Sequence, residues 1–316
     1  QKYIDDFPGL VSPLYGIMDT SFHLGGPIQK DKIWFFLGAQ YYRSKNRPAG
    51  YPDFIDYKQP RGFLKITSQL SSRLKMTVFY EHDEYTGIGR AGNAYTPPEA
   101  TVRQESPDNV GNLALTYIFS PTTFLDVKGS FFVGRYYLDP ENGMDTTAVW
   151  SAEMGSWMYN SSWYYYADRS RYQANAGLSH FAEDFIQGDH DFKFGAELEF
   201  GWAKSQYGYT GYVEGIGNSV YIYDWYGYLY AYQYEGYVVD SKYTRADLFA
   251  QDSWSVTDNF TINLGVRLSM NRGFVDGVSG AMYKTNRLAP RFGFAWDIFG
   301  DHKTVLKAHY LSLIHI

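Results

Sequence analysis

Hydrophobic and polar residues alternate along several segments of the chain, most regularly in residues 260–271. The apolar set there is Phe260, Ile262, Leu264, Val266, Leu268 and Met270, and the intervening set is Thr261, Asn263, Gly265, Arg267, Ser269 and Asn271. An extended strand places these two sets on opposite faces. Residues 192–200 repeat the pattern, with Lys193, Glu197 and Glu199 on the polar side. Three charges on one face of a short strand cannot lie in a dry core, so that face must be wet.

The same period-two pattern predicts about twelve strands. Two further clear cases lie at residues 74–81 and 291–298, where the second sets Arg291 on the polar side. The remaining strands are expected at residues 15–24, 33–45, 62–70, 110–119, 124–138, 172–181, 243–254 and 304–313. Each is close to the roughly ten residues of a tilted strand that crosses a membrane.

The connections between these strands alternate between short and long. Compact turns rich in Gly, Pro, Asp, Asn and Ser fall at residues 25–32, 71–73, 120–123, 182–189, 256–259 and 300–303. Long segments lie between them at residues 46–61, 84–109, 139–171, 206–242 and 273–287. In an up-and-down barrel this alternation places all short turns on one rim and all long loops on the other, as in outer-membrane barrels. A sandwich or propeller gives no reason for it.

Composition narrows the class further. The 316 residues include 31 Tyr, 22 Phe and 8 Trp, which excludes a disordered polymer, and no Cys, which excludes disulfides and thiolate metal sites. The formal net charge is −6 and basic residues are scattered, which disfavours a nucleic-acid partner. Mean hydropathy is −0.39 and no apolar run approaches the roughly 20 residues of a spanning helix. Spanning strands score weakly on such scales, because half of their residues face a polar lumen.

Aromatic residues gather near the expected strand ends, for example Trp34, Tyr136 and Trp254. Girdles at the two membrane interfaces would explain this placement, and ordinary aromatic residues of a sandwich core are the alternative. Nothing near Gln1 looks like a signal peptide, so we expect either a removed signal or a fragment.

Four motifs carry a resemblance to a known family. The run LGGPIQKDKIWFFLGAQYYR at residues 24–43 resembles the first barrel segment of Oar-like TonB-dependent outer-membrane transporters. LFAQDSWSVTDNFTINLGVRL (residues 248–268), LAPRFGFAWDIFGDHKTVLKAHY (residues 288–310) and GDHDFKFGAE (residues 188–197) are similar to later strands and hairpins of that family. The four motifs lie near both ends and in the middle of the chain, so the resemblance spans nearly all of it.

The resemblance implies a 22-stranded barrel, a plug domain inside it, and energy supplied from the inner membrane through TonB. About twelve strands are fewer than such a barrel contains. We therefore expect an all-β, antiparallel, up-and-down transmembrane β-barrel that is partial, with residues 1–316 as one barrel domain and with the plug and the C-terminal strands absent from this chain. Residues 311–316 are suspect as native sequence, because the hairpin motif should continue there. A fragment of the wall should form an open, curved sheet.

Other motifs indicate no catalytic or metal site. Gly87, Gly89 and Gly92 fit G-x-G-x-x-G, but the prolines that follow forbid the helix of a dinucleotide site, so a loop is expected. The acidic segment at residues 139–145 could offer oxygen ligands to Ca²⁺, although a solvated acidic loop fits its spacing better. We predict no enzyme activity, no cofactor and no metal.

The strongest candidate for binding is a pair of aromatic-rich loops. The residues expected to contact an extracellular ligand are Trp157, Tyr159, Trp163, Tyr164, Tyr223, Trp225, Tyr226 and Tyr228. Tyr and Trp offer a flat apolar face and a hydrogen-bonding edge at low entropic cost, which suits sugars, peptides or proteins. The alternative is that these residues pack on one another in hairpins that extend the barrel, which the alternation at residues 227–232 favours; the two are compatible.

The sequence thus predicts an importer in the outer membrane of a Gram-negative-type bacterium, taking up a large ligand of the glycan or peptide type. Its partners would be membrane lipid, the ligand, its own plug and, through the full-length chain, the TonB complex. Lumen residues expected to face the plug are Lys193, Glu197, Glu199, Arg267 and Arg291. A passive porin without a plug and a soluble, aromatic-rich carbohydrate-binding β-protein are the alternatives. The ligand itself cannot be named from the sequence.

Overall fold

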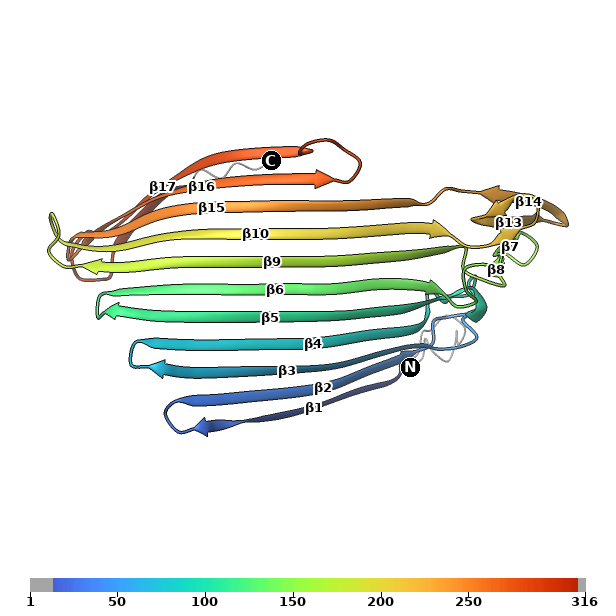
Figure 1. Ribbon diagram of the computed structural model, residues 1–316, viewed down its shortest axis with the longest axis horizontal. Helices are drawn as coiled ribbons and strands as arrows, with labels where there is room; N and C mark the ends of the chain where they lie inside the picture. The colour runs from blue at the N-terminus through green and yellow to red at the C-terminus, as the bar shows by residue number, and fades with distance from the viewer. Residues whose placement is uncertain (1–13, 312–316) are drawn as a thin grey trace.

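The chain forms one twelve-stranded antiparallel sheet in which each strand pairs with its neighbours along the chain (Figure 1). The computed structural model describes residues 14–311. The strands of this sheet are β1 (Leu14–Gln29), β2 (Ile33–Asn46), β3 (Ile55–Ser71), β4 (Leu74–Arg90), β5 (Val102–Ser120), β6 (Thr123–Pro140), β9 (Trp163–Ala182), β10 (Asp189–Tyr209), β15 (Tyr237–Thr257), β16 (Phe260–Val275), β17 (Tyr283–Asp297) and β18 (Val305–Leu311). The expected all-β, up-and-down meander is confirmed.

Short turns and long loops lie at opposite ends of this sheet (Figure 1). The turns at residues 30–32, 72–73, 121–122, 183–188, 258–259 and 298–304 share one rim. The loops at residues 47–54, 91–101, 141–162, 210–236 and 276–282 share the other, which we call the loop rim. The short turns use left-handed backbone at Asp31 (φ 62°), Gly188 (φ 74°) and Gly300 (φ 67°), conformations that Gly and Asp tolerate best. The alternation of connections read from the sequence is therefore confirmed.

Most strands are much longer than expected. The sequence predicts a strand over residues 192–200, whereas β10 runs from Asp189 to Tyr209, which is 21 residues. At about 3.3 Å per residue such a strand is roughly 70 Å long, about twice what a bilayer requires. The extra length of β10 lies mostly toward the loop rim and shortens the loop that follows it relative to the prediction. The alternation of hydrophobic and polar residues does not reveal this extra length, because water meets both faces of a strand above the membrane and no alternation is needed there.

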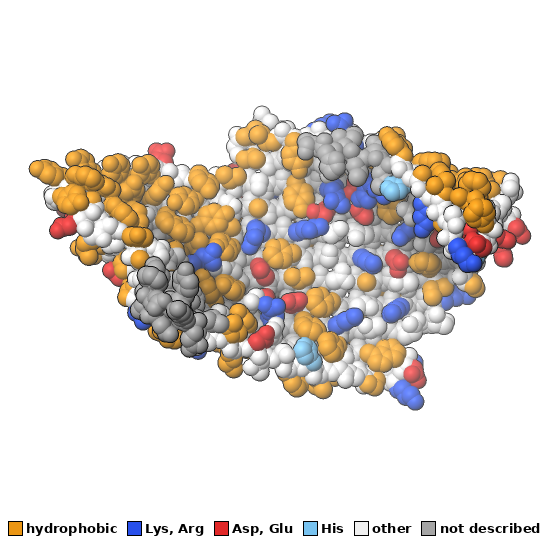
Figure 2. All heavy atoms as spheres, turned by 180° about the vertical axis from the view of Figure 1, so that it is seen from behind, with side chains coloured by type: hydrophobic (Ala, Val, Ile, Leu, Met, Phe, Trp, Pro, Cys, Tyr) orange, Lys and Arg blue, Asp and Glu red, His pale blue; other side chains and the backbone are white. Residues whose placement is uncertain are grey.

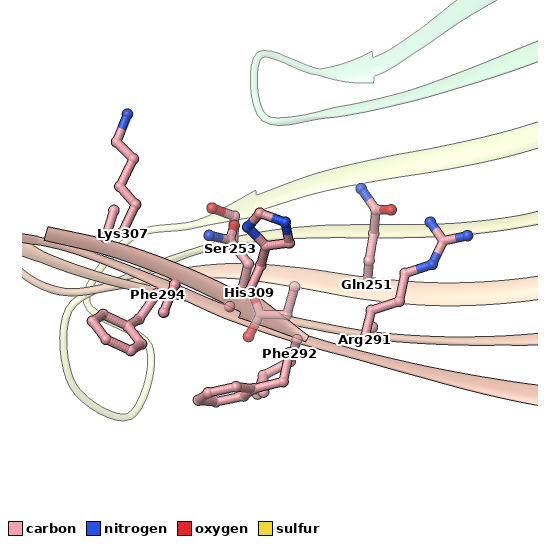
Figure 3. A pocket seen from close by; sticks show the side chains of 14 residues that line it. Gln251, Ser253, Arg291, Phe292, Phe294, Lys307 and His309 are labelled. Atoms are coloured by element: carbon pink, nitrogen blue, oxygen red, sulfur yellow. The ribbon is translucent and has the colours of Figure 1, made fainter. Parts of the chain in front are cut away.

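The two faces of the sheet differ in chemistry. One row across β10, β15, β16 and β17 consists of Lys193, Gln251, Gly265 and Arg291. The adjacent row on the opposite face consists of Phe194, Ala250, Val266 and Pro290. Charged side chains are spread over the middle of one face (Figure 2). The close view of β15 to β18 shows Gln251, Arg291 and His309 on one side of the strands, with Phe292 and Phe294 on the other (Figure 3).

The apolar face of the sheet body has no protein layer over it. Leu198, Leu248 and Phe292 remain 58%, 52% and 48% exposed. The buried apolar residues lie instead at or near the loop rim and are Tyr51, Ile55, Ala100, Val102, Leu138, Ala148, Ala167 and Val220. A soluble sandwich would bury one face of each sheet in its middle, so this distribution is that of a membrane barrel wall. Within residues 14–311 no helix has the length and apolarity to cross a membrane.

The sheet is open. Among the described residues β1 and β18 each pair with one neighbour and not with each other. An unpaired edge exposes backbone hydrogen-bonding groups that lipid cannot satisfy, so in a membrane these edges must pair with further strands. The open sheet is consistent with part of a larger barrel. The expected oddity of residues 311–316 falls almost entirely outside the described residues.

Candidate functional site

A second, smaller sheet stands at the loop rim and joins two long loops. It consists of β7 (Val149–Ser151), β8 (Ser156–Met158), β13 (Val220–Trp225) and β14 (Tyr228–Gln233), in the order β14-β13-β7-β8. We call it the loop sheet. The first pair of strands belongs to the loop between β6 and β9, and the second pair belongs to the loop between β10 and β15. The parallel pairing of β7 with β13 connects them, so the site requires both loops together.

One face of the loop sheet is aromatic on all four strands. The register places Trp157, Trp150, Tyr223 and Tyr230 in a single row across it. The pairs Tyr221 with Tyr232 and Trp225 with Tyr228 flank that row. We call these eight side chains the aromatic face. The opposite face of β13 and β14 carries Val220, Ile222 and Leu229, because successive residues of a strand point to opposite sides.

The rings of the aromatic face contact one another and remain accessible. The ring centroids of Trp150 and Trp157 are 5.4 Å apart, and those of Tyr223 and Trp225 are 6.2 Å apart and nearly parallel. Trp225 is 50% exposed, Tyr228 70% and Tyr230 51%. Apolar side chains gather at the loop end of the molecule (Figure 2). Such a surface can stack against flat or cationic groups of a ligand.

The β13–β14 hairpin has a two-residue turn that fixes its register. Tyr226 and Gly227 both have positive φ, at 50° and 89°, as a type I′ turn requires. The backbone N–H of Gly227 donates to Asp224 Oδ1 at 2.8 Å, which closes the turn. The Tyr226 ring lies edge-on to Trp225 at 5.3 Å. The hairpin favoured by the sequence at residues 227–232 is thus present.

Buried polar contacts hold the loop sheet on the rim. Asn160 is fully buried, and its Nδ2 donates to the backbone oxygens of Gly143 and Thr146, both at 2.8 Å. The backbone N–H of Ile222 donates to Ala148 O at 2.9 Å. The backbone N–H of Trp157 donates to Tyr95 O at 2.9 Å, which ties in a third loop. Because these contacts link three loops, the aromatic face rests on a defined platform.

Burial and a hydrogen bond with Tyr234 raise the pKa of Tyr221 to about 12. An ordinary Tyr, with a pKa of about 10, is already protonated at physiological pH, so the raised pKa of Tyr221 matters only in strong alkali.

The eight residues predicted for ligand contact do not all meet. Trp157, Tyr223, Trp225 and Tyr228 belong to the aromatic face, and Tyr226 adjoins it. The other three lie elsewhere. Trp163 and Tyr164 are the first residues of β9: the Trp163 ring stacks on Tyr207 with centroids 6.1 Å apart, and the Tyr164 hydroxyl accepts a hydrogen bond from Gln206 Nε2 of β10 at 3.0 Å. Tyr159 follows β8 and is 56% exposed. The eight predicted residues leave out Trp150, Tyr221, Tyr230 and Tyr232 of the aromatic face. The strand of Trp150 has three residues and is too short for any periodic signal.

The predicted lumen residues lie on the polar face, and three of the five already have partners. Arg267 donates to Glu197 and to Asp247, and Asp247 also pairs with Arg245 at 2.8 Å. Glu199 pairs with Arg171 at 2.9 Å and accepts a hydrogen bond from Tyr243. Lys193 and Arg291 make no hydrogen bond or ion pair with any described residue. Of the five predicted residues, these two cations are therefore free to bind another surface.

No metal site accompanies these features in the described part of the chain. No group of three or more His, Asp or Glu side chains between residues 14 and 311 is arranged to hold a metal ion. In the acidic segment, Asp139 accepts a hydrogen bond from the Tyr166 hydroxyl, and the Asn142 side chain donates to Tyr159 O. The cavity in Figure 3 is lined by residues of both faces beside the edge strand β18. We assign it no ligand.

The main sheet is similar to solved outer-membrane receptors. It superposes on FpvA of P. aeruginosa bound to a heterologous pyoverdine with a TM-score of 0.67 and 12% identity, covering 93% of this chain and 40% of that one. The alcaligin receptor FauA of Bordetella pertussis gives 0.64 and 15%, covering 95% and 42%. The outer-membrane transporter YddB of Escherichia coli gives 0.62 and 13%, covering 93% and 38%. At such identities the likeness shows the fold, and the chain spans about two fifths of each structure.

A family model supplies the assignment. Residues 52–284 match the model described as "Outer membrane beta barrel domain", which is well over half of the chain. No curated protein matches the sequence. The match confirms the expected outer-membrane location and the barrel architecture, and it overturns the alternative of a soluble β-protein. No comparison specifies the Oar-like subtype. The chain belongs to the outer-membrane β-barrel domain family.

Proposed function

We propose that this chain is part of the wall of a TonB-dependent outer-membrane transporter. In this proposal the aromatic face captures a large ligand of the glycan or peptide type outside the cell, and the full-length protein imports it without covalent chemistry. The observation that carries the proposal is the aromatic face itself. Eight Trp and Tyr side chains from two separate loops share one accessible side of a sheet, at the rim opposite the short turns. Large rigid aromatic side chains give contact area at low entropic cost.

The solved relatives support the transport part of the proposal. YddB is described as an outer-membrane transporter, and FpvA is seen in complex with an iron-loaded pyoverdine. The pyoverdine is a ligand of FpvA and is not assigned to this chain. The likeness lies in the barrel wall, so only the general role of moving a ligand across the outer membrane is carried over.

The polar face supports a partner inside the barrel. Lys193 and Arg291 point to the same side as Glu197, Glu199 and Arg267 but are not paired within the described residues. An unpaired cation is stabilised by carboxylates or carbonyl oxygens of an apposed surface. In the proposal that surface is the plug domain of the full-length protein, and TonB acts on the plug.

Uptake by whole cells tests the proposal. Cells that express the full-length protein receive fluorescein-labelled maltohexaose or a fluorescein-labelled decapeptide of alternating Lys and Ser. We expect periplasmic accumulation of at least one probe, and this accumulation should require both the protein and a functional TonB. A Tyr223→Ala/Tyr230→Ala variant should lose it, whereas Leu229→Ala on the opposite face should not. Uptake that persists without TonB would favour a porin, and absence of uptake for both probes would contradict import of either ligand type.

A further inference from the structure

The loops of the loop rim have a strong excess of acidic over basic residues. Its five loops contain nine carboxylates, which are Asp53, Glu99, Glu141, Asp145, Glu153, Glu214, Asp224, Glu235 and Asp276. They contain one basic residue, Arg47, whose Nε donates to Tyr51 O at 2.8 Å. The two loops that form the loop sheet have no Lys, Arg or His at all between β6 and β9 or between β10 and β15.

The short-turn rim differs in this respect. Its turns hold the acidic residues Asp31, Glu183, Asp184, Asp258 and Asp301 and the basic residues Lys30, Lys32, Arg73 and Lys303. Acidic and basic residues are therefore nearly balanced there. The acidic excess of the loop rim thus centres on the two loops of the loop sheet, which contribute six of its nine carboxylates and no basic residue. A one-sided charge of this kind attracts cations and repels anions within about 10 Å at ordinary ionic strength.

Aromatic rings elsewhere near this rim already hold cations of the chain. The Arg90 guanidinium lies 5.5 Å from the Tyr136 ring centre, and that of Arg135 lies 5.6 Å from the Tyr137 ring centre. Lys45 lies 4.2 Å from the Phe54 ring centre. Among the described residues, no cation lies over a ring of the aromatic face. Its rings are open to a cation from outside.

We propose that the aromatic face binds a cationic peptide segment through its Lys or Arg side chains. This inference rests on the proposed function, in which the aromatic face is the capture site. Ammonium and guanidinium groups would stack over the Tyr and Trp rings, and the surrounding carboxylates would supply long-range attraction. The carboxylates without a role in holding the loops, such as exposed Glu153, Glu214 and Glu235, are available for this.

An anionic ligand fits the same surface poorly. Carboxylates and phosphates are bound mainly by Arg, Lys and backbone N–H groups, and the loop sheet supplies no basic side chain. A neutral glycan could stack on the rings and donate hydroxyl hydrogen bonds to the carboxylates, but it would gain nothing from their net negative charge. The charge distribution therefore favours the basic peptide over both.

Fluorescence anisotropy with purified full-length protein in detergent tests the inference. Three fluorescein-labelled probes are compared: a Lys-Ser decapeptide, a Glu-Ser decapeptide and maltohexaose. We expect the Lys-Ser peptide to bind at least about tenfold more tightly than the Glu-Ser peptide, because the first is attracted and the second repelled. Tyr230→Ala should weaken Lys-Ser binding roughly tenfold, whereas Leu229→Ala, at a 69% exposed site on the other face of the same strand, should leave it unchanged.

Two variants that remove carboxylate charge, one on each rim, complete the test. Glu153→Gln/Glu235→Gln should weaken Lys-Ser binding and flatten its salt dependence, whereas Asp258→Asn on the short-turn rim should do neither. Equal or tighter binding of the Glu-Ser peptide would overturn the inference, as would equal loss of Lys-Ser binding in Leu229→Ala. Tyr230-dependent binding of maltohexaose without Lys-Ser binding would overturn it but leave the capture site standing. Binding of no probe would count against the inference and the proposed capture site together.

Discussion

Trp150 and Tyr223 lie side by side in one row of the loop sheet, although they come from two different long loops. Their strands pair in parallel, a geometry that no hairpin can produce and that needs the two barrel strands β9 and β10 between the loops to bring them together. The aromatic face is therefore a product of the barrel. Neither loop contains it alone.

Removing this link should loosen the loop sheet without unfolding the barrel. Trp150→Ala removes the ring contact with Trp157 and leaves Tyr223 with no aromatic partner opposite it on β7. Since Trp150 is half-buried, we expect a loss of ~2 kcal/mol, below the cost for a fully buried Trp. Hydrogen exchange of the β7 and β13 amides should speed up markedly, while Tyr159→Ala should leave it unaltered. Unchanged protection in Trp150→Ala would show that the parallel pairing does not depend on this ring.

The two faces of β16 should respond oppositely to the same substitution. Leu264→Arg places a guanidinium on the apolar face, where an Arg costs roughly 2–4 kcal/mol near the bilayer midplane and less toward an interface. Asn263→Arg places it one residue earlier on the polar face, where water and a plug can solvate it. We expect less heat-modifiable full-length protein in the outer membrane for the first variant and a normal amount for the second. Similar amounts for both would contradict the assignment of faces.

Replacing a paired cation and replacing an unpaired cation of the polar face should change the thermal stability by different amounts. Arg267→Gln leaves Asp247, whose side chain is nearly inaccessible, with Arg245 as its remaining ion-pair partner. Leaving a buried carboxylate without any partner costs about 3 kcal/mol. Arg245 offsets part of that cost here, so the thermal midpoint of the purified full-length protein should fall by a smaller but measurable amount. Lys193→Gln removes no contact within the wall and should leave that midpoint nearly unchanged unless the plug uses it. A larger fall for Lys193→Gln would mean that plug contacts outweigh those in the wall.

Strong alkali should open the loop sheet through Tyr221. Burial raises the pKa of Tyr221 to about 12 in the folded protein, against about 10 when unfolded. The unfolded form thus binds fewer protons between pH 10 and pH 12, so stability falls as pH rises through that window. Cleavage of the loops by an alkaline protease should increase there in the natural protein and less in Tyr221→Phe. An identical pH profile for the two proteins would show that another group controls the opening.

Sequence periodicity predicted well the half of the main sheet that lies toward the short turns. The twelve strands, their antiparallel order and the opposed faces of residues 192–200 and 260–271 all follow from a membrane that is apolar on one side of the wall. The outer halves of the strands were missed, because residues such as Trp202 and Tyr207 extend β10 above the membrane with no need to alternate.

The candidate site was predicted only in part. The richness in Tyr and Trp pointed to the right loops, and the hairpin at residues 220–233 follows from local alternation and the Tyr226-Gly227 turn. The parallel contact between β7 and β13 is long-range and depends on the positions of the barrel strands, so no local pattern could show it. The same limit explains why Trp163 and Tyr164 were grouped with the aromatic face but belong to the rim.

The central claim is that the aromatic loops and the short turns lie on opposite sides of the outer membrane. It is tested most directly by site-specific labelling of full-length protein in intact cells, and this chain has no Cys of its own to react. Tyr228→Cys in the loop sheet should react with a membrane-impermeant maleimide at once. Asp258→Cys in the turn between β15 and β16 should react only after the outer membrane is permeabilised. Equal labelling of both variants in intact cells would contradict the account.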